Sequence, residues 1–344
     1  MPALAVADAL RARGAEVSFV GTRERAEAEL VPAAGYEIDF LRVRGVDRSN
    51  PVRAAGALSL AARAVPAARR ILLERGAQAV LGGGGYVAAP VGLAAGRLRL
   101  PLILTEADRH LGLANRLLAR RAHRICLAFP IPGMEDDRYL VTGRPVPAAI
   151  GHGSRAGARE RYGIAADDRC LLVFGGSQGA RSINLAALEG LTKPAGRDFH
   201  VLHFSGTRDY DEAASLLRDA GSPPRYTLVA YEPSLADALA ASDLVLARAG
   251  ASVFELAAAA RPAILVPYPY ATGRHQHANA EWMADAGAAV VIDDGELTGE
   301  RVRATVTELL GDAGRLGRMA DASRSLAMPH AADQVAAELL DSIA

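Results

Sequence analysis

Apolar runs that stop at a turn and are followed by a helical stretch recur along the whole chain, and this alternation restricts the possible folds most. In the first half the runs are "AEVSFVG", "YEIDFLRV", "AQAVLGGGG", "LPLILTEAD", "RICLAF" and "RYLVTG". In the second half they are "CLLVFGG", "FHVLHFSG", "YTLVAY", "DLVLARAG", "PAILVPY" and "AAVVID". Strands that alternate with helices form parallel sheets covered on both faces. The sequence therefore predicts an α/β fold with doubly wound sheets.

Two such sheets are expected, because 344 residues exceed the size of one ordinary core. Segment 143–163 is rich in proline and glycine and interrupts the alternation, as a linker does. We therefore predict a first domain at residues 1–146 and a second at 147–325. The tail, 326–344, has a helical pattern and is expected to pack back on the first domain. In doubly wound sheets ligands bind beyond the carboxyl ends of the strands, so residues there are the site candidates.

Charge is unevenly distributed although the formal net charge is zero. Residues 1–150 carry 21 arginines against 14 acidic residues, a net charge of +7, and the remainder is acidic by the same amount. This asymmetry indicates an anionic partner for the first half, with solvated surface charge as the alternative. The arginines are scattered among few aromatic residues, which does not favour nucleic acid. Cys126 and Cys170 stand in apolar contexts and are predicted to be buried free thiols.

The stretch "CLLVFGGSQGARSIN" places Gly175 and Gly176 between a strand and a helix. Glycine permits positive φ and lets another group approach the main chain closely. The first N–H groups of the helix lack intrahelical acceptors and favour an anion such as phosphate. Ser177 is expected to cap the helix or to donate its hydroxyl to a phosphate oxygen. The alternative is a tight strand-to-helix turn with a serine cap and no ligand.

The stretch "RAGASVFE" repeats this pattern after "DLVLA". Gly250 is expected to free the backbone and Ser252 to lie at a helix start, so that two helix N-termini hold a diphosphate without a metal ion. The carboxylate of Glu255, one turn inside the helix, could accept hydrogen bonds from both hydroxyls of a ribose. Its alternative role is that of an acid favoured by the helix dipole.

Several stretches together resemble the MurG family of bacterial cell-wall glycosyltransferases: "GGSQGARSIN", "RAGASVFE", "RHQHANA" followed by "AGAA", and "GGGGYVAAP". "LAVADALRARGAEVSFVGT", "AELVPAAGYEIDFLRVRG" and "RPAILVPYP" extend the resemblance over nearly the whole chain. The resemblance implies a GT-B fold, in which two Rossmann-like domains face a cleft. It implies transfer of N-acetylglucosamine from UDP-GlcNAc to the MurNAc C4 hydroxyl of lipid I, giving lipid II for peptidoglycan synthesis. No cofactor is implied.

The resemblance also implies which residues bind the donor and the acceptor. The implied donor-binding residues are Gly175, Gly176, Ser177, Gln178, Glu232, Gly250, Ala251, Ser252, Glu255, Arg274, Gln276 and Asn279. Ser177 and Gln178 face the diphosphate and sugar, and the backbone near Glu232 meets uracil. Gln276 and Asn279 are three residues apart and share a helix face, with cap and turn chemistry as the alternative. The implied acceptor or cleft residues are Gly84, Gly85, Tyr86, Asp108 and Arg144.

The sequence departs from the family at the catalytic base. The family begins with a strand and a GGTGGHxxP loop whose histidine is the usual candidate base, whereas Met1 stands where that loop has just ended. We attribute the difference to a start codon placed too late or to a shortened chain. Thr105 stands where a histidine is common in the family, and Pro147 where an arginine is expected. Asp108 and Glu106 are the fallback bases, because they are the acids at a first-domain strand end.

The implied reaction inverts the anomeric centre, with a general base at the acceptor hydroxyl. No DxD-type acidic pair follows a second-domain strand, which suits a metal-free diphosphate site. The resemblance places the protein peripherally on the cytoplasmic face of the bacterial plasma membrane, with UDP-GlcNAc, lipid I and the bilayer surface as partners and no nucleic acid. Two alternatives stay open: another GT-B enzyme with a different acceptor, or a nucleotide-sugar-binding protein that lacks turnover because the usual base is missing.

A membrane-facing patch is expected in residues 53–75. Apolar side chains such as Val65, Ile71 and Leu72 alternate there with arginines, as on an interfacial helix, and core packing is the alternative. Pro66 within this stretch predicts two helices. No apolar run reaches the roughly 18 residues of a transmembrane helix. The first residues read as an amphipathic helix and not as a signal peptide.

Overall fold

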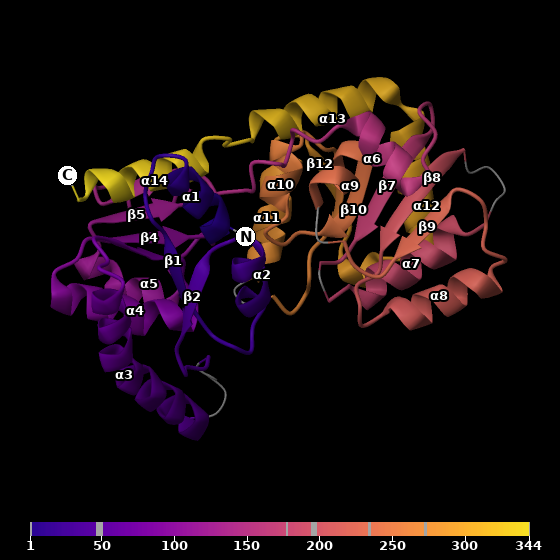
Figure 1. Cartoon of the computed structure of the whole chain (residues 1–344). Coiled ribbons are helices and arrows are strands. Elements are labelled where there is room, and N and C mark those ends of the chain that lie inside the picture. Colours follow the sequence, from indigo (N-terminus) through magenta and orange to yellow (C-terminus); the bar gives the residue numbers. More distant parts are fainter. Residues whose placement is uncertain are drawn as a thin grey trace. The chain divides into compact units, whose positions relative to one another are not determined.

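The computed structural model divides the chain into two units (Figure 1). Unit 1 comprises Met1–Pro147 and Met328–Ala344, and unit 2 comprises Ala148–Ala327. The structure describes residues 2–45, 51–176, 178–193, 198–232, 235–271 and 274–343, without the side chains of 51–55 and 58. Ser177 therefore falls outside the described residues, as do the side chains of Arg53 and Leu58 in the expected membrane patch at 53–75.

All described strand pairs in unit 1 are parallel, as the alternation predicts. They form two separate sheets, one of two strands and one of four in the order β3-β4-β5-β6. The strands are β1 (Ser18–Gly21), β2 (Glu37–Phe40), β3 (Val80–Gly82), β4 (Leu102–Glu106), β5 (Arg124–Leu127) and β6 (Tyr139–Val141). The helices are α1 (Pro2–Arg11), α2 (Glu27–Ala33), α3 (Pro51–Glu74), α4 (Gly85–Leu98), α5 (Leu113–Leu118), η1 (Ala119–Arg121) and α14 (Ala331–Asp341).

Helices cover both faces of the four-stranded sheet. Helices α3, α4 and α5 share one apolar cluster with the sheet, which contains Leu104 and Ile125. On the other face Ile103 and Cys126 pack against α1 and the C-terminal helix α14. The tail thus returns to the sheet of unit 1. Burial raises the pKa of the Cys126 thiol to about 12, so this cysteine is an inert core residue.

Helix α3 is a single helix that continues through Pro66, so the prediction of two helices is wrong (Figure 1). Proline removes one backbone hydrogen bond, but residue 62, whose carbonyl loses its partner, is exposed and open to water. The burial of residues in the same helix also corrects the prediction of a membrane-facing patch in residues 53–75. Val65, Ile71 and Leu72 are buried in the core, and among the described side chains of α3 the large apolar one that is exposed is Leu73.

Unit 2 contains one six-stranded parallel sheet in the order β12-β11-β10-β7-β8-β9. Its strands are β7 (Arg169–Phe174), β8 (Phe199–Phe204), β9 (Tyr226–Val229), β10 (Leu244–Arg248), β11 (Ala263–Val266) and β12 (Ala289–Val291). Its helices are α6 (Arg155–Tyr162), α7 (Arg181–Leu191), α8 (Tyr210–Asp219), α9 (Leu235–Ala241), α10 (Val253–Ala258), α11 (His275–Asp285), η3 (Asp294–Glu296), α12 (Gly299–Gly311) and α13 (Ala313–Ser325).

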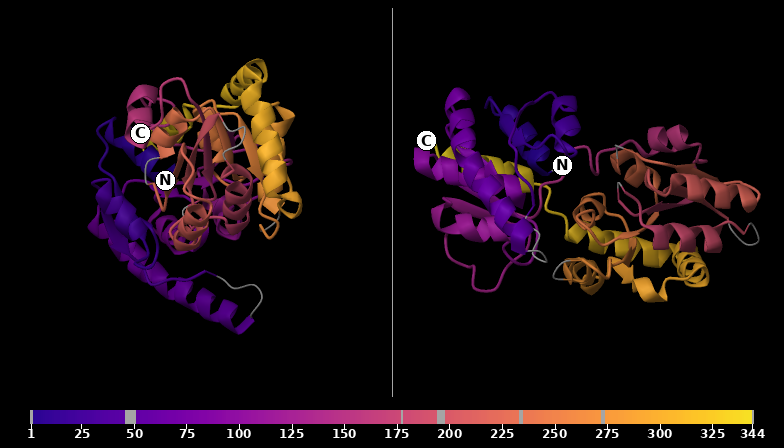
Figure 2. Two further views of the ribbon diagram at one scale, coloured as in Figure 1. Left: turned by 90° about the vertical axis from the view of Figure 1, so that its right-hand side faces the viewer. Right: turned by 90° about the horizontal axis from the view of Figure 1, so that it is seen from below.

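The core of unit 2 explains why helices lie on both faces of this sheet (Figure 2). Leu171 and Val173 of β7 pack with apolar residues of α7 and α12 in one cluster. Because alternate strand residues point to opposite faces, Cys170 and Leu172 face the other side, where α9 contacts β7. All four residues are fully buried. The unbroken apolar run of β7 is therefore the signature of a strand covered twice.

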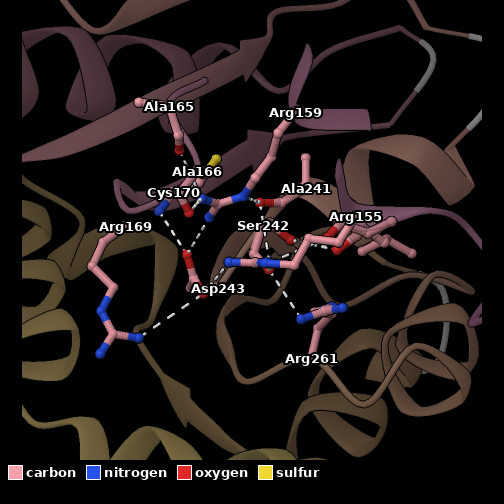
Figure 3. A network of polar contacts seen from close by, with 12 residues as sticks. Arg155, Arg159, Ala165, Ala166, Arg169, Cys170, Ala241, Ser242, Asp243 and Arg261 are labelled. Carbon is pink, nitrogen blue, oxygen red and sulfur yellow. Dashed lines mark hydrogen bonds and ion pairs between the residues drawn. The ribbon is translucent and has the colours of Figure 1, made fainter. Parts of the chain in front are cut away.

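A cluster of charges fastens α6 to the amino ends of β7 and β10 (Figure 3). Asp243 accepts hydrogen bonds from Arg155 at 2.7 Å, from Arg159 at 3.0 Å and from the amide of Cys170 at 2.8 Å. The buried Arg159 also donates to the carbonyls of Ala165, Ala166 and Ala241. These bonds compensate a guanidinium that would be costly to bury alone. The cluster lies at the edge of the sheet opposite to the one that carries glycine turns.

Replacing Asp243 with alanine should lower the free energy of unfolding of unit 2 by about 3–5 kcal/mol, because Arg159 would stay buried without its counter-charge. Urea unfolding followed by tryptophan fluorescence measures this, since the single tryptophan, Trp282, lies in α11 of unit 2. Asp321→Ala is the control: it removes the exposed ion pair with Arg324 and should change stability by less than about 1 kcal/mol. Equal effects of the two substitutions would contradict a structural role for the cluster.

Candidate functional site

The strand order of unit 2 contains one point where the chain reverses its direction of travel across the sheet. From β7 the chain proceeds to β8 and β9, then returns to the other side of β7 and continues through β10, β11 and β12. Neighbouring strands β7 and β10 are in register, with Phe174 opposite Ala247. At such a switch point the two connections leave for opposite faces and open a crevice. The two glycine turns of the sequence analysis are the ones that follow these two strands.

The first turn, after β7, depends on its glycines. Gly176 has φ +99°, and a Cβ on Gly175 would lie 2.3 Å from the Cβ of Ala180, so neither position accepts a side chain. Gln178 is exposed on the turn. Helix α7 begins after Ala180, which is its N-cap and makes no side-chain hydrogen bond. Ala180 cannot cap the helix with its side chain, and the prediction for Ser177 lies outside the described residues.

A second glycine contact locks this turn to the one after β8. Gly179 has φ +80°, and a Cβ there would lie 2.1 Å from the carbonyl oxygen of Ser205. Gly206 has φ +82°, and its Cβ would lie 2.2 Å from the amide nitrogen of Gly179. The two main chains thus touch with no room for a methyl group on either side. This contact fixes the path of the first turn.

A buried polar network lies beneath the same contact, and the sequence analysis missed it. Asn184 of α7 donates to the carbonyl of Ser205 at 2.9 Å and to Asp209 at 3.2 Å. Its side-chain oxygen therefore accepts from Nε2 of His203, 3.0 Å away, and Nδ1 of His203 accepts from the Tyr226 hydroxyl at 2.8 Å. Complete burial lowers the pKa of His203 to about 3, so the ring is neutral. A histidine inside the apolar strand "FHVLHF" was the available signal.

The second turn, after β10, is held by side chains of α11. Asn279 is buried and donates to the carbonyl of Ala249 at 3.1 Å and to that of Gly250 at 3.5 Å. Gln276 accepts a hydrogen bond from the amide of Tyr268 at 2.9 Å, and a Cβ on Gly250 would lie 3.9 Å from its amide nitrogen. Gln276 and Asn279 thus lie on the side of α11 that contacts this turn. In the described structure both side chains form hydrogen bonds to main-chain groups and hold them in place.

Two expectations for the second turn need correction. Gly250 is not among the residues with positive φ, so the turn does not require its conformational freedom. Ser252 is the N-cap of α10, but its hydroxyl donates to the carbonyl of Arg248 at 3.4 Å and does not cap the helix. Ala251 is exposed between them, and Glu255 is half-buried in the first turn of α10. The turn presents main-chain groups and one carboxylate.

Arg248 joins the two turns and was also missed as a functional candidate. It ends β10, forms an ion pair with Asp294 at 2.6 Å and donates to the Ser182 hydroxyl in the first turn of α7 at 2.7 Å. It also donates to the carbonyl of Val266 at the end of β11. Its side chain is only 12% exposed. An arginine at the end of an apolar strand, as in "LVLAR", was the signal for this role.

The remaining donor candidates are Glu232 and Arg274. The carboxylate of Glu232 accepts from Arg161 at 2.7 Å and from the Tyr162 hydroxyl at 2.8 Å, so it binds α6. The side chain of Glu232 thus makes contacts within unit 2. Arg274 is exposed and is the N-cap of α11, with a left-handed φ of 52°.

The first-unit candidates follow β3 and β4, which are neighbouring strands. Gly84 and Gly85 have φ values of +79° and +71° and start α4, in which Tyr86 accepts a hydrogen bond from Arg25 at 3.1 Å. These turns thus share one edge of the sheet with Glu106, which ends β4, and with Asp108, two residues beyond it. Arg144 is half-buried just after Gly143.

Glu106 is a loop anchor. Its buried carboxylate accepts four hydrogen bonds: from the amides of Ala107, Asp108 and Gly112 and from the side chain of Asn115. A carboxylate has about four acceptor positions, so none is left for an acceptor proton. The geometry therefore disfavours Glu106 as the fallback base. Within the described part of the chain, the Asp108 carboxylate makes no hydrogen bond or ion pair, so Asp108 is the better fallback of the two.

No group of three or more His, Cys, Asp or Glu side chains in the described part of the chain is arranged to hold a metal ion. None of the helices described is both long enough and apolar enough to span a membrane.

Comparison with known proteins gives a consistent result over the whole chain. The glycosyltransferase family 28 N-terminal domain matches residues 1–127, and the family's C-terminal domain matches residues 170–335. The UDP-N-acetylglucosamine–N-acetylmuramyl-(pentapeptide) pyrophosphoryl-undecaprenol N-acetylglucosamine transferase of Halorhodospira halophila is 40% identical over 97% of this chain and 92% of the relative. The protein of the same name from Moorella thermoacetica is 39% identical over 99% and 95%. The crystal structure of Acinetobacter baumannii MurG is 30% identical, with a TM-score of 0.75 over 99% of this chain and 95% of that one.

Gly179→Ala should destabilise unit 2 by at least about 2 kcal/mol, because the new Cβ needs both positive φ and space that Ser205 occupies. Gly317→Ala is the matched control. Gly317 lies in α13 with nothing within 4 Å of a Cβ, so alanine there should stabilise by about 0.5–1 kcal/mol. Urea unfolding of both variants measures the difference. A neutral Gly179→Ala would contradict the close contact between the two turns.

The neutral His203 makes the stability of unit 2 depend on pH. Its folded pKa of about 3 lies below the ordinary 6.5, so between these values only the unfolded chain binds the proton. Stability is then present above pH 6.5 and lost as the pH falls, by about 2 kcal/mol at pH 5. Between pH 7 and pH 5, the free energy of unfolding of wild type should fall by about 2 kcal/mol more than that of His203→Gln, as measured by urea unfolding. Equal losses would show that His203 is protonated in the folded state.

Proposed function

This chain belongs to the MurG family of glycosyltransferases, and on that premise we propose that it transfers N-acetylglucosamine from UDP-GlcNAc to lipid I. The acceptor is the muramyl sugar of the pyrophosphoryl-undecaprenol-linked pentapeptide that the relatives' names specify, and the product is lipid II of peptidoglycan synthesis. The protein is a UDP-GlcNAc-dependent glycosyltransferase with the GT-B fold.

The observation that carries the donor site is the pair of turns at the switch point. We assign the diphosphate of UDP-GlcNAc to the crevice between them, because ligands bind at such points in doubly wound sheets. The uncapped first amides of α7, beside Gly175 and Gly176, supply hydrogen-bond donors for phosphate oxygens. The main chain at Gly250 and Ala251 supplies a second set on the other side. Asn279 and Arg248 contribute indirectly, since they hold these turns in place.

The other parts of the donor are assigned by position along this edge. Glu255 stands one turn beyond Gly250 and, as a carboxylate, accepts hydrogen bonds from two ribose hydroxyls. The main chain near Glu232 meets uracil. Gln178, Gln276 and Arg274 are proposed for the sugar and the adjoining phosphate.

The reaction we propose is a single displacement with inversion. The acceptor oxygen forms a bond to the anomeric carbon while the bond from that carbon to the UDP oxygen breaks. The acceptor proton passes to a base, and UDP leaves with the bonding electrons and one more negative charge. Amides of the two turns, with Arg274, stabilise that charge in place of a metal ion. Asp108 is our candidate base within this chain.

We further propose that unit 1 meets the surface of the membrane that carries the acceptor. Leu73 of α3 is 54% exposed, and Leu113 and Leu117 of α5 are 46% and 51% exposed. Leu113 and Leu117 are one helical turn apart and share a face, with the exposed Arg116 beside them. Apolar side chains flanked by arginine suit the boundary of an anionic bilayer. The proposed membrane contact thus uses exposed side chains, in place of the α3 residues that were expected to face the membrane and are buried in the core.

The test of the function is a transfer assay with UDP-GlcNAc and a short-chain lipid I analogue, in the presence of a chelator. We expect transfer by the wild-type chain, with an inverted product. Glu255→Ala should raise the KM for UDP-GlcNAc about tenfold or more, because an ionised carboxylate loses its hydrogen bonds to ribose, and should leave the KM for the acceptor unchanged.

UDP binding isolates the ribose contact from turnover. Wild type should bind UDP more tightly than 2′,3′-dideoxy-UDP, whereas Glu255→Ala should bind the two equally. If both proteins lost the same affinity on removal of the hydroxyls, the assignment of Glu255 would be wrong. If UDP bound and no transfer occurred with any acceptor, the enzyme activity of this chain would be refuted while its donor site stood.

A further inference from the structure

Unit 1 contains a cavity of about 1060 Å³. Of the donor and acceptor candidates named above, Tyr86 alone is among its lining residues. The cavity opens beyond the carboxyl ends of β1 and β2, which lie in register with Gly21 opposite Phe40. Tyr86 of α4 and Leu60 of α3 also line it. A Cβ on Gly45, in the segment after β2, would lie 3.7 Å from the Tyr86 ring. Residues that follow β1 and β2 therefore line one space together with Tyr86 of α4.

Arginines outnumber acids around this cavity. Four arginines line it: Arg23 and Arg25 after β1, and Arg42 and Arg44 after β2. The two acids in the lining are Glu24 and Asp39, and Asp39 forms an ion pair with Arg75 at 2.9 Å. Among the described residues, none of the four arginines forms an ion pair with a carboxylate. The sequence analysis noted the excess of arginine in the first half and did not locate it.

Neutral groups hold two of these arginines in place. The guanidinium of Arg23 lies over the ring of Phe40, 4.7 Å from its centroid. Arg25 donates from Nε to the Tyr86 hydroxyl and lies 5.8 Å from the centroid of that ring. Stacking and a hydroxyl orient a guanidinium without cancelling its charge. Each arginine keeps a planar pair of N–H donors, the geometry that matches two oxygens of a carboxylate or phosphate.

Size and lining indicate what kind of anion fits. Ligand pockets commonly measure about 300–1,000 Å³, far more than a single phosphate needs. Apolar residues, among them Ile38 and the buried Leu41, form part of the wall. The ligand should therefore combine oxyanions with carbon-rich groups. The acceptor named for the relatives has both, because a pyrophosphoryl group and a pentapeptide are attached to its muramyl sugar.

We propose that this arginine-lined pocket binds the anionic part of the acceptor, through its pyrophosphate or through the carboxylates of its peptide. The proposal rests on the proposed function for the identity of the acceptor, and it deepens that function by giving unit 1 a recognition subsite. Arg23 and Arg25 act as positioned oxyanion donors, and Arg42 and Arg44 complete the positive wall. The donor diphosphate keeps its own site in unit 2.

Direct binding tests the pocket without turnover. Two probes separate the sources of the anion: inorganic pyrophosphate, and an N-acetylmuramyl-pentapeptide without phosphate. Saturating UDP is present throughout, so that the donor turns are occupied. We expect one of the probes to bind wild type and the Arg23→Gln/Arg25→Gln double variant to bind it at least about tenfold more weakly, since charge-assisted hydrogen bonds are lost. Arg63→Gln/Arg97→Gln, which removes two exposed arginines of unit 1 outside the pocket, should bind as wild type does.

Each possible outcome supports or overturns the proposal. Weakened binding of pyrophosphate identifies the phosphate source, and weakened binding of the muramyl-peptide identifies the carboxylates. Failure of both probes to bind wild type, or equal binding by wild type and the Arg23/Arg25 variant, overturns the proposal. In the transfer assay the same variant should raise the KM for the acceptor and leave that for UDP-GlcNAc unchanged. Transfer with an unchanged KM for the acceptor in this variant would refute the role of the pocket and leave the proposed function standing. Binding of a probe without transfer would refute the proposed function and leave the pocket as a binding site.

Discussion

The contact between main chains at the ends of β7 and β8 is the constraint on which the candidate site depends. Gly179 and Gly206 approach so closely that neither tolerates a methyl group. Their contact sets the path from β7 to α7, and thereby the direction of the uncapped amides of that helix. The network of Asn184, His203 and Asp209 supports the contact from below. Rigid support of this kind matters because amides stabilise charge only if they are already oriented.

The sequence predicted the fold class and the glycine turns that follow the strands, because both follow from local pattern. Buried parallel strands must be apolar throughout, and glycine marks the turns where main chain approaches main chain. The same logic located both turns of unit 2. It could not assign partners to individual side chains. Ser252 and Glu232 bind other parts of the protein, and Arg248 joins two turns whose proximity appears only in the folded sheet.

In unit 1, tertiary packing outweighs local sequence preferences at several positions. Pro66 predicts a break in α3, but the buried face of that helix holds it together across the proline. The apolar residues that suggested a membrane patch are the ones that provide this packing. Glu106 similarly resembles a free acid at a strand end, and it instead organises the loop that follows. The pocket of arginines escaped notice because its members come from two segments that adjoin only when β1 pairs with β2.

Taken together, each unit would use the carboxyl ends of its strands for one half of the reaction. A crystal structure of the chain with UDP bound tests the central claim most directly. The account predicts that both phosphates lie in the crevice between the turns after β7 and β10, with oxygens about 3 Å from backbone amides near Gly176 and Gly250. A diphosphate bound anywhere else on unit 2, or only on unit 1, would contradict it.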